Sequence, residues 1–161
     1  MQFVESVRRV TITTDKIEES LRFYRDALRM KIWYDGTIHD AQVNELFGLL
    51  PSSATRVVIL YSGQNYVAGM IGLMEFQGEN LASMPRSNSK TPLAGEAIIM
   101  MTALRIKELY ENLLQYGFEI IAPPTRLEIP NRECVYEMMT RDPNGVRVTF
   151  AQQGEIERQF L

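Results

Sequence analysis

The sequence predicts an α+β fold in which two βαββ modules form a curled mixed sheet around a groove. Residues 9–32 (RVTITTDKIEESLRFYRDALRMKI) have the pattern of a strand, an amphipathic helix and a second strand. Residues 98–120 (IIMMTALRIKELYENLLQYGFEI) repeat that order in different letters. Further strand-like stretches follow each helix, so the βαββ unit occurs twice. We expect the residues that line a groove between the two halves to decide function.

The length of 161 residues fits a single domain, 1–161, that is large enough for a substantial core. Residues 78–96 (GENLASMPRSNSKTPLAGE) are rich in Ser, Asn, Pro and Gly and lack periodicity, which is typical of a linker. The predicted organisation is therefore a first module, a linker, a second module and a tail, at 1–77, 78–96, 97–153 and 154–161.

In the first module, apolar and polar residues alternate over 9–14, as expected for a half-buried strand. The helix that follows has apolar side chains at helical spacing, namely Ile17, Leu21, Tyr24 and Leu28. Arg29 occupies the place after this helix where a glycine would be usual. The remaining expected elements are strands at 31–35, 56–63 and 67–76 and a short helical segment at 41–50.

The second module has the same order of elements. Its helix, 105–116, ends at Gly117, a residue well suited to a helix end. Asp142–Gly145 (DPNG) strongly favours a turn between its last two strands. Its strands are expected at 97–102, 119–123, 134–140 and 146–152.

Composition argues against several partners and locations. A net charge of −3 and a pI near 5.3 argue against nucleic acid, which calls for a basic face. No run of residues approaches the roughly 20 apolar ones that span a bilayer, and the N-terminus lacks the apolar segment of a signal peptide. Cys134 is the only cysteine, which favours a reducing compartment. We therefore expect a cytoplasmic protein with no nucleic-acid or membrane partner.

Two motifs, SLRFYRDALRMKI and later RDPNGVRVTF, resemble the vicinal oxygen chelate superfamily, which includes glyoxalase I, bleomycin-resistance proteins and extradiol dioxygenases. The resemblance covers nearly the whole chain and implies a glyoxalase-like fold and a homodimer. It also implies one divalent metal in the groove, held by His or Gln on the first strand and Glu on the last strand of each module.

Carried over to this chain, those ligand positions fall on Arg9, Glu75, Ile98 and Thr149. Only Glu75 is an ordinary metal ligand, because arginine offers no acceptor atom and isoleucine has no donor. A divalent transition metal needs several N, O or S donors. His39, the only histidine, lies outside these positions. We therefore expect no metal at the family site and no cofactor.

Strand alternation places Arg9, Thr11 and Thr13 on one face of the first strand. Arg147 and Thr149 are expected on the corresponding face of the last strand, although the pattern leaves the direction of Arg147 open. Such a floor of cations and hydroxyls could orient a carboxylate, enolate or phenolate of a small molecule. An alternative is that Arg9 and Glu75 form an ion pair that replaces the metal structurally.

Two further residues are candidates for ligand contact. Met100 has a thioether side chain that adapts to a flat apolar molecule, although most strand methionines here are expected to pack in the core. Tyr66 carries a phenol that can donate a hydrogen bond, although tyrosines in strands are common. The direction of Glu137, a second possible carboxylate, is left open by the pattern.

These residues leave three functions open. The first is a metal-independent protein, similar to the bleomycin-resistance branch, that binds a small, partly apolar organic molecule in the groove. The second is a lyase or isomerase in which Glu75 is the base and Arg9 stabilises developing negative charge. The third is a metal-dependent glyoxalase-like lyase.

Overall fold

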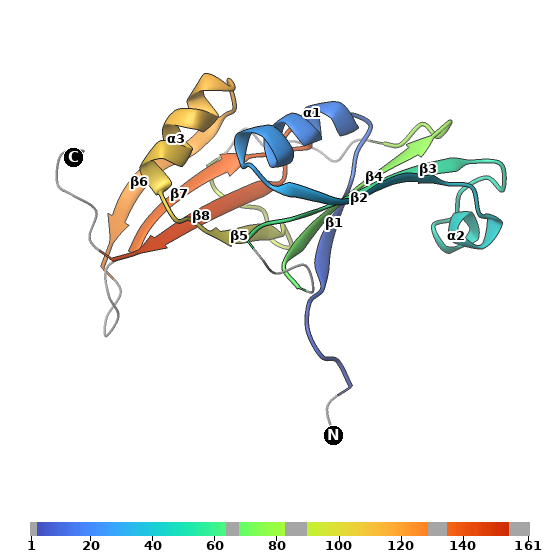
Figure 1. The fold of residues 1–161 in the computed structure, drawn as a ribbon, viewed down its shortest axis with the longest axis horizontal. Helices are drawn as coiled ribbons and strands as arrows, with labels where there is room; N and C mark the ends of the chain where they lie inside the picture. Colours follow the sequence, from blue (N-terminus) through green and yellow to red (C-terminus); the bar gives the residue numbers. More distant parts are fainter. Residues whose placement is uncertain (1–2, 64–67, 83–89, 129–134, 155–161) are drawn as a thin grey trace. The chain divides into compact units, whose positions relative to one another are not determined.

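The computed structural model describes residues 3–63, 68–82, 90–128 and 135–154. The chain divides into two compact units, Met1–Pro85 and Arg86–Leu161. Each unit contains one four-stranded mixed sheet with helical segments, and the predicted α+β class is confirmed (Figure 1). The boundary between the units falls inside the predicted linker, 78–96.

The first unit has the strand order β1-β4-β3-β2, with β1 parallel to β4 and the other neighbours antiparallel. Its elements are β1 Arg9–Thr13, α1 Ile17–Leu21, the π-helical turn η1 Arg22–Ala27, β2 Lys31–Ile38, α2 Ala41–Leu46, β3 Ala54–Tyr61 and β4 Met70–Gln77. The predicted helix is therefore one α-helical turn that continues into a π-helical segment. Figure 1 shows α1 lying across one side of this sheet.

The second unit has the matching order β5-β8-β7-β6, with β5 parallel to β8. Its elements are β5 Ile98–Thr102, α3 Ile106–Gln115, β6 Ile120–Leu127, β7 Val135–Arg141 and β8 Arg147–Gln153. Strands β2 and β6 both run several residues beyond their predicted ends, and each has a register shift against its neighbour. These two edge strands lack the regular alternation from which an end could be predicted.

The strands of the two units pair in the same register within each unit. Arg9 pairs with Met70 in the first parallel pair, and Ile98 pairs with Arg147 in the second. Position by position, β1 therefore corresponds to β5, and β4 corresponds to β8. This correspondence allows a residue in one unit to be compared with its counterpart in the other.

Each sheet has two faces, which we name by the helix of the same unit. The helix face packs under that helix, and the distal face is the opposite one. The main core of the first unit lies on its helix face and is built from residues that are almost completely buried, namely Ile12, Leu21, Phe23, Tyr24, Val58, Leu60 and Leu73. In the second unit the corresponding buried residues are Ile106, Leu113, Met138, Val148 and Phe150.

Candidate functional site

The distal face of the first sheet carries the polar residues of β1. Arg9, Thr11 and Thr13 are exposed, whereas the intervening Ile12 is buried toward the helix. Parallel pairing sets Thr11 beside Gly72 of β4. The structure therefore brings together the three first-strand residues that the sequence assigned to one face.

The Arg9 side chain lies beside Gly72 of β4, whose lack of a side chain leaves room for it. Its Nε donates a hydrogen bond of 3.1 Å to Oγ1 of Thr11. A Cβ atom added at Gly72 would lie 2.9 Å from that same Oγ1 and 3.5 Å from Cδ of Arg9. Within the described part of the chain, no carboxylate pairs with Arg9. Gly72 was missed in the sequence, although a glycine inside an apolar strand indicates close approach of other atoms.

An apolar cluster covers the rest of this distal face. Its buried members are Val57, Ile59, Met70, Met74 and Phe76, and Ile38, Leu49 and Tyr61 pack against them half-buried. Beside the cluster, the Tyr34 ring lies over Gly36, where an added Cβ would meet the phenol oxygen at 2.5 Å. Tyr34 is 39% exposed and presents an aromatic surface on the same side of the sheet.

Glu75 lies on the opposite, helix face, so it does not form the ion pair with Arg9 that the sequence left open as an alternative. Its Oε1 accepts a hydrogen bond of 3.4 Å from the backbone N–H of Ile17, the first residue of α1. Its neighbour on β3, Arg56, forms ion pairs with Glu18 at 2.7 Å and Asp35 at 3.0 Å. The hydrogen bonds to Asp35 and then Glu18 raise the pKa of Arg56.

The second unit repeats the role of Glu75 with an uncharged residue. Gln152 occupies the equivalent position on β8, and its Oε1 accepts a hydrogen bond of 2.7 Å from the N–H of Ile106, the first residue of α3. Both side chains satisfy one of the N–H groups that a helix start leaves without a partner. Since a neutral amide does the same work, the carboxylate of Glu75 has a structural explanation.

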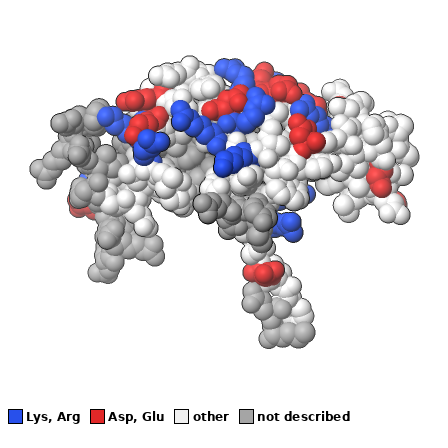
Figure 2. All heavy atoms as spheres, viewed as in Figure 1, with Lys and Arg blue, Asp and Glu red and all other residues white. Residues whose placement is uncertain are grey.

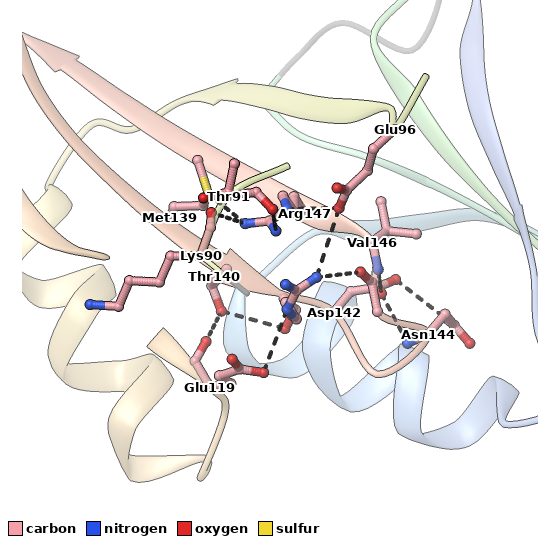
Figure 3. A network of polar contacts seen from close by, with 12 residues as sticks. Lys90, Thr91, Glu96, Glu119, Met139, Thr140, Asp142, Asn144, Val146 and Arg147 are labelled. Atoms are coloured by element: carbon pink, nitrogen blue, oxygen red, sulfur yellow. Dashed lines mark hydrogen bonds and ion pairs between the residues drawn. The ribbon is translucent and has the colours of Figure 1, made fainter. Parts of the chain in front are cut away.

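Arg147 lies on the distal face of the second sheet with Thr149, but it is completely buried. Its Nε donates to Glu96 at 2.7 Å, and its terminal nitrogens donate to the carbonyls of Lys90 at 2.9 Å and Thr91 at 3.2 Å (Figure 3). The N–H of Leu93 and then Arg147 lower the pKa of Glu96. Arg147 therefore holds the segment 90–96 against the sheet.

The remaining predicted site residues fall in several places. Met100 is 63% exposed on the distal face of the second sheet, and its neighbour Thr149 is buried. Glu137 lies half-buried on the same face, opposite Ala151. Tyr66 lies outside the described residues, as does Cys134. His39 is exposed, and the adjacent Asp40 caps α2 by accepting from the N–H groups of Gln42 and Val43.

The residues at the family's metal positions do not fit a divalent cation. Arg9, Ile98 and Thr149 supply at most one weak neutral oxygen, and Glu75 lies on the other face of its sheet. On either side of Glu75 in β4, Met74 and Phe76 lie on the distal face and offer a thioether and an aromatic ring, which are no substitute for a carboxylate. The described residues also contain no group of three or more His, Cys, Asp or Glu that could hold a metal ion.

The surface of the first unit is divided between charged and uncharged regions. Figure 2 shows Lys, Arg, Asp and Glu side chains interspersed over α1, and a largely uncharged surface over α2. Apolar side chains around α2 are exposed, namely Leu46, Phe47 and Leu50. None of the helices in the described ranges is long and apolar enough to cross a membrane.

Comparison with known proteins identifies the family. A glyoxalase family protein from Bacillus cereus superposes with a TM-score of 0.78 at 15% identity, covering 96% of this chain and 97% of that one. TnmS3, an antibiotic binding protein from Streptomyces sp. CB03234, superposes with a TM-score of 0.60 at 12% identity, covering 96% and 100%. A virulence protein from Salmonella typhimurium gives 0.55 at 18% identity, covering 95% and 100%.

These superpositions show a shared fold. No curated protein matches the chain. The family model described as Glyoxalase/Bleomycin resistance protein/Dioxygenase superfamily matches residues 6–150, almost the full length of the sequence. The chain therefore belongs to the Glyoxalase/Bleomycin resistance protein/Dioxygenase superfamily.

Proposed function

We propose that this protein binds a small, partly apolar organic molecule on the distal face of the first sheet, without a metal. The observation that carries the proposal is the exposed guanidinium of Arg9 beside the apolar cluster, at a position where a metal enzyme of the family needs a ligand. The likeness to TnmS3, an antibiotic binding protein, supports a binding function within the same fold.

A lyase or isomerase based on Glu75 has no support from the geometry. Glu75 accepts a hydrogen bond from the start of α1 and lies on the face opposite Arg9. A base must reach the proton that it removes, and its electrostatic partner must reach the charge that develops. Those two groups cannot serve one substrate from opposite sides of a sheet.

The proposal is tested with N-phenyl-1-naphthylamine, a flat, neutral fluorescent probe. Thr13→Glu places a charge beside Met74 on the distal face, whereas Thr37→Glu makes the same change at an exposed site on the helix face of the same sheet. We expect saturable binding that Thr13→Glu weakens at least about fivefold and Thr37→Glu leaves unchanged, because burying a charge against an apolar ligand is costly. Absence of saturable binding, or equal effects of both variants, would contradict the proposal.

We also propose a cytoplasmic homodimer. The exposed apolar side chains around α2 support association, since large apolar patches on a surface mark sites of contact. The single cysteine supports a reducing location. Size-exclusion chromatography with light scattering should give twice the 18.5 kDa of one chain. Leu50→Glu should shift the mass to that of the monomer, while a constant monomeric mass would refute the dimer.

A further inference from the structure

We infer that Arg9 is an oxyanion-binding group that selects ligands bearing a carboxylate. This inference rests on the proposed function and deepens it, because it names the chemical class of the ligand. Three features of the described residues carry it: the lack of an acidic partner for Arg9, the way its side chain is held, and the apolar cluster next to it.

The second unit provides an internal comparison. Arg147 lies on the distal face of its sheet, as Arg9 does, but it is fully buried and satisfied by Glu96 and two backbone carbonyls. That arrangement is what a purely structural arginine requires, since a buried charge needs partners. Arg9 is exposed and, within the described ranges, contacts no carboxylate. The ion pair that could have explained Arg9 structurally is absent because Glu75 lies on the other face.

The side chain of Arg9 is nevertheless held in place. Its Nε donates to Thr11, so that bond fixes the inner edge of the guanidinium plane. The two terminal nitrogens then form the outer edge, the geometry that binds both oxygens of a carboxylate side by side. Gly72 leaves the space that Thr11 and the Arg9 methylenes occupy. The two terminal nitrogens of Arg9 are therefore an oriented pair of N–H donors on the surface of the sheet.

The strand residues next to Arg9 offer a place for the apolar body of such a ligand. Arg9 pairs with Met70, and Thr13 pairs with Met74, both members of the apolar cluster on the distal face. Met70 and Met74 are almost completely buried, so a ring would lie over the exposed Thr11 and Thr13 beside them and bring a carboxylate substituent to Arg9. Packing there would also shield the charge pair from water, which strengthens it relative to an exposed ion pair.

The test uses matched acid and amide probes, 2-naphthoate with 2-naphthamide and indole-3-acetate with indole-3-acetamide, titrated by calorimetry into the full chain. Each pair has the same shape and differs in charge. We expect the wild-type protein to bind the acid about tenfold more tightly than the amide, the size expected for one charge-assisted hydrogen-bonded pair. Arg9→Gln should abolish that preference and leave amide affinity within about twofold.

Arg8→Gln is the matched control, because Arg8 is an exposed arginine one residue before β1 and its loss changes net charge equally. It should leave the preference intact. Thr11→Val removes the acceptor that holds Nε and should lower the acid-to-amide ratio severalfold, with the melting temperature unchanged. A loss of binding to both probes alike would instead indicate general damage to the surface and would overturn the positioning role.

The outcomes separate this inference from the function on which it rests. Equal affinities for acid and amide in the wild-type protein would overturn the role of Arg9, and the metal-free binding function would stand. The role of Arg9 is overturned in the same way if N-phenyl-1-naphthylamine binds and neither member of either pair does. If that neutral probe also fails to bind, the proposed function is overturned together with the inference.

Discussion

Glu75 shows how a single residue can be misassigned when its strand is apolar on both faces. In β1, strict alternation correctly placed Arg9, Thr11 and Thr13 together. In β4 (MIGLMEFQ), the residues before Glu75 are buried on both faces, so periodicity does not say which way it points. The structure resolves the direction through its hydrogen bond to Ile17.

Substitutions at Glu75 should therefore affect stability alone. Glu75→Gln reproduces the residue that the second unit uses at this position, Gln152, and should change the free energy of unfolding by no more than about 0.5 kcal/mol. Glu75→Ala removes the acceptor and should cost about 1 kcal/mol. Urea denaturation of both variants, with probe titration beside it, checks this. Loss of probe binding in Glu75→Gln would restore a functional role for the carboxylate.

The sequence predicted that Arg147 binds a ligand, but its complete burial indicates a role in stability. Arg147→Ala removes the guanidinium that donates to Glu96 and to the carbonyls of Lys90 and Thr91. We expect the free energy of unfolding to fall by roughly 2–4 kcal/mol, as when one partner of a buried ion pair is removed. Arg105→Ala breaks only an exposed pair with Glu108 and should stay within about 0.5 kcal/mol. Similar small losses for both variants would refute the anchoring role.

The lowered pKa of Glu96 predicts how this anchor responds to acid. The N–H of Leu93 and then Arg147 favour the ionised form, so the folded-state pKa lies below the ordinary value of 4.5. Stability from this group is therefore present above pH 4.5 and is lost as pH falls through the folded pKa. The free energy of unfolding, measured from pH 7 to pH 3, should be lower for Glu96→Gln than for the wild-type protein at neutral pH. This difference should become smaller in acid.

Glu111→Gln, at an exposed position on α3, is the control for the acid titration, and its difference from wild type should stay small at every pH. A gap between Glu96→Gln and wild type that widened in acid would have the wrong sign and would contradict the assignment. The carboxylate of Glu96 and the guanidinium of Arg147 are 51 positions apart in sequence, so spacing alone could not pair them.

At the scale of elements, the two helix ends offer a matched pair. Arg29 follows η1 with φ +56°, and Gly117 follows α3 with φ +77°. Both residues directly follow the end of a helix. In each case the next backbone N–H donates a hydrogen bond to a carbonyl of the helix: Met30 to Tyr24, and Phe118 to Leu113. The sequence correctly marked Arg29 as an unusual residue for this place.

Glycine should be favoured at both positions, because the left-handed region is strained for residues with a Cβ. Arg29→Gly should raise the free energy of unfolding by about 0.5–1 kcal/mol, whereas Gly117→Ala should lower it by about 1–2 kcal/mol. Both residues are exposed, so lost packing contributes little. Thermal denaturation compares the two variants. Destabilisation by Arg29→Gly would show that the arginine side chain makes a contact worth more than the strain.

Element order was predictable, but several boundaries were not. The helix of the second module was expected at 105–116 and is found at Ile106–Gln115, because its apolar spacing and closing glycine are both strong. The helix of the first module has equally good spacing, yet its second half is π-helical, and periodicity does not distinguish the two conformations over so few residues. The extra length of β2 and β6 lies at sheet edges, where burial imposes no pattern.

At the scale of the whole molecule, the duplicated βαββ order was readable because each module repeats the same hydrophobic pattern. The family followed from the helix motif and the DPNG turn, and the family model confirms it. Which residues share a site was harder to predict, since it depends on strand register and on backbone donors that composition does not reveal. A groove enclosed by both modules, and the single-domain organisation, stay predictions.

In the proposed function, Arg9 stands in the binding face where the family's enzymes hold a metal. The most direct test is calorimetric titration of the purified protein with 2-naphthoate before and after exhaustive treatment with EDTA, with metal content measured in parallel. We predict an unchanged affinity, no stoichiometric Zn, Ni, Mn or Fe, and a loss of about tenfold in Arg9→Gln. One equivalent of such a metal, together with binding that EDTA abolishes and Arg9→Gln does not affect, would contradict this role of Arg9.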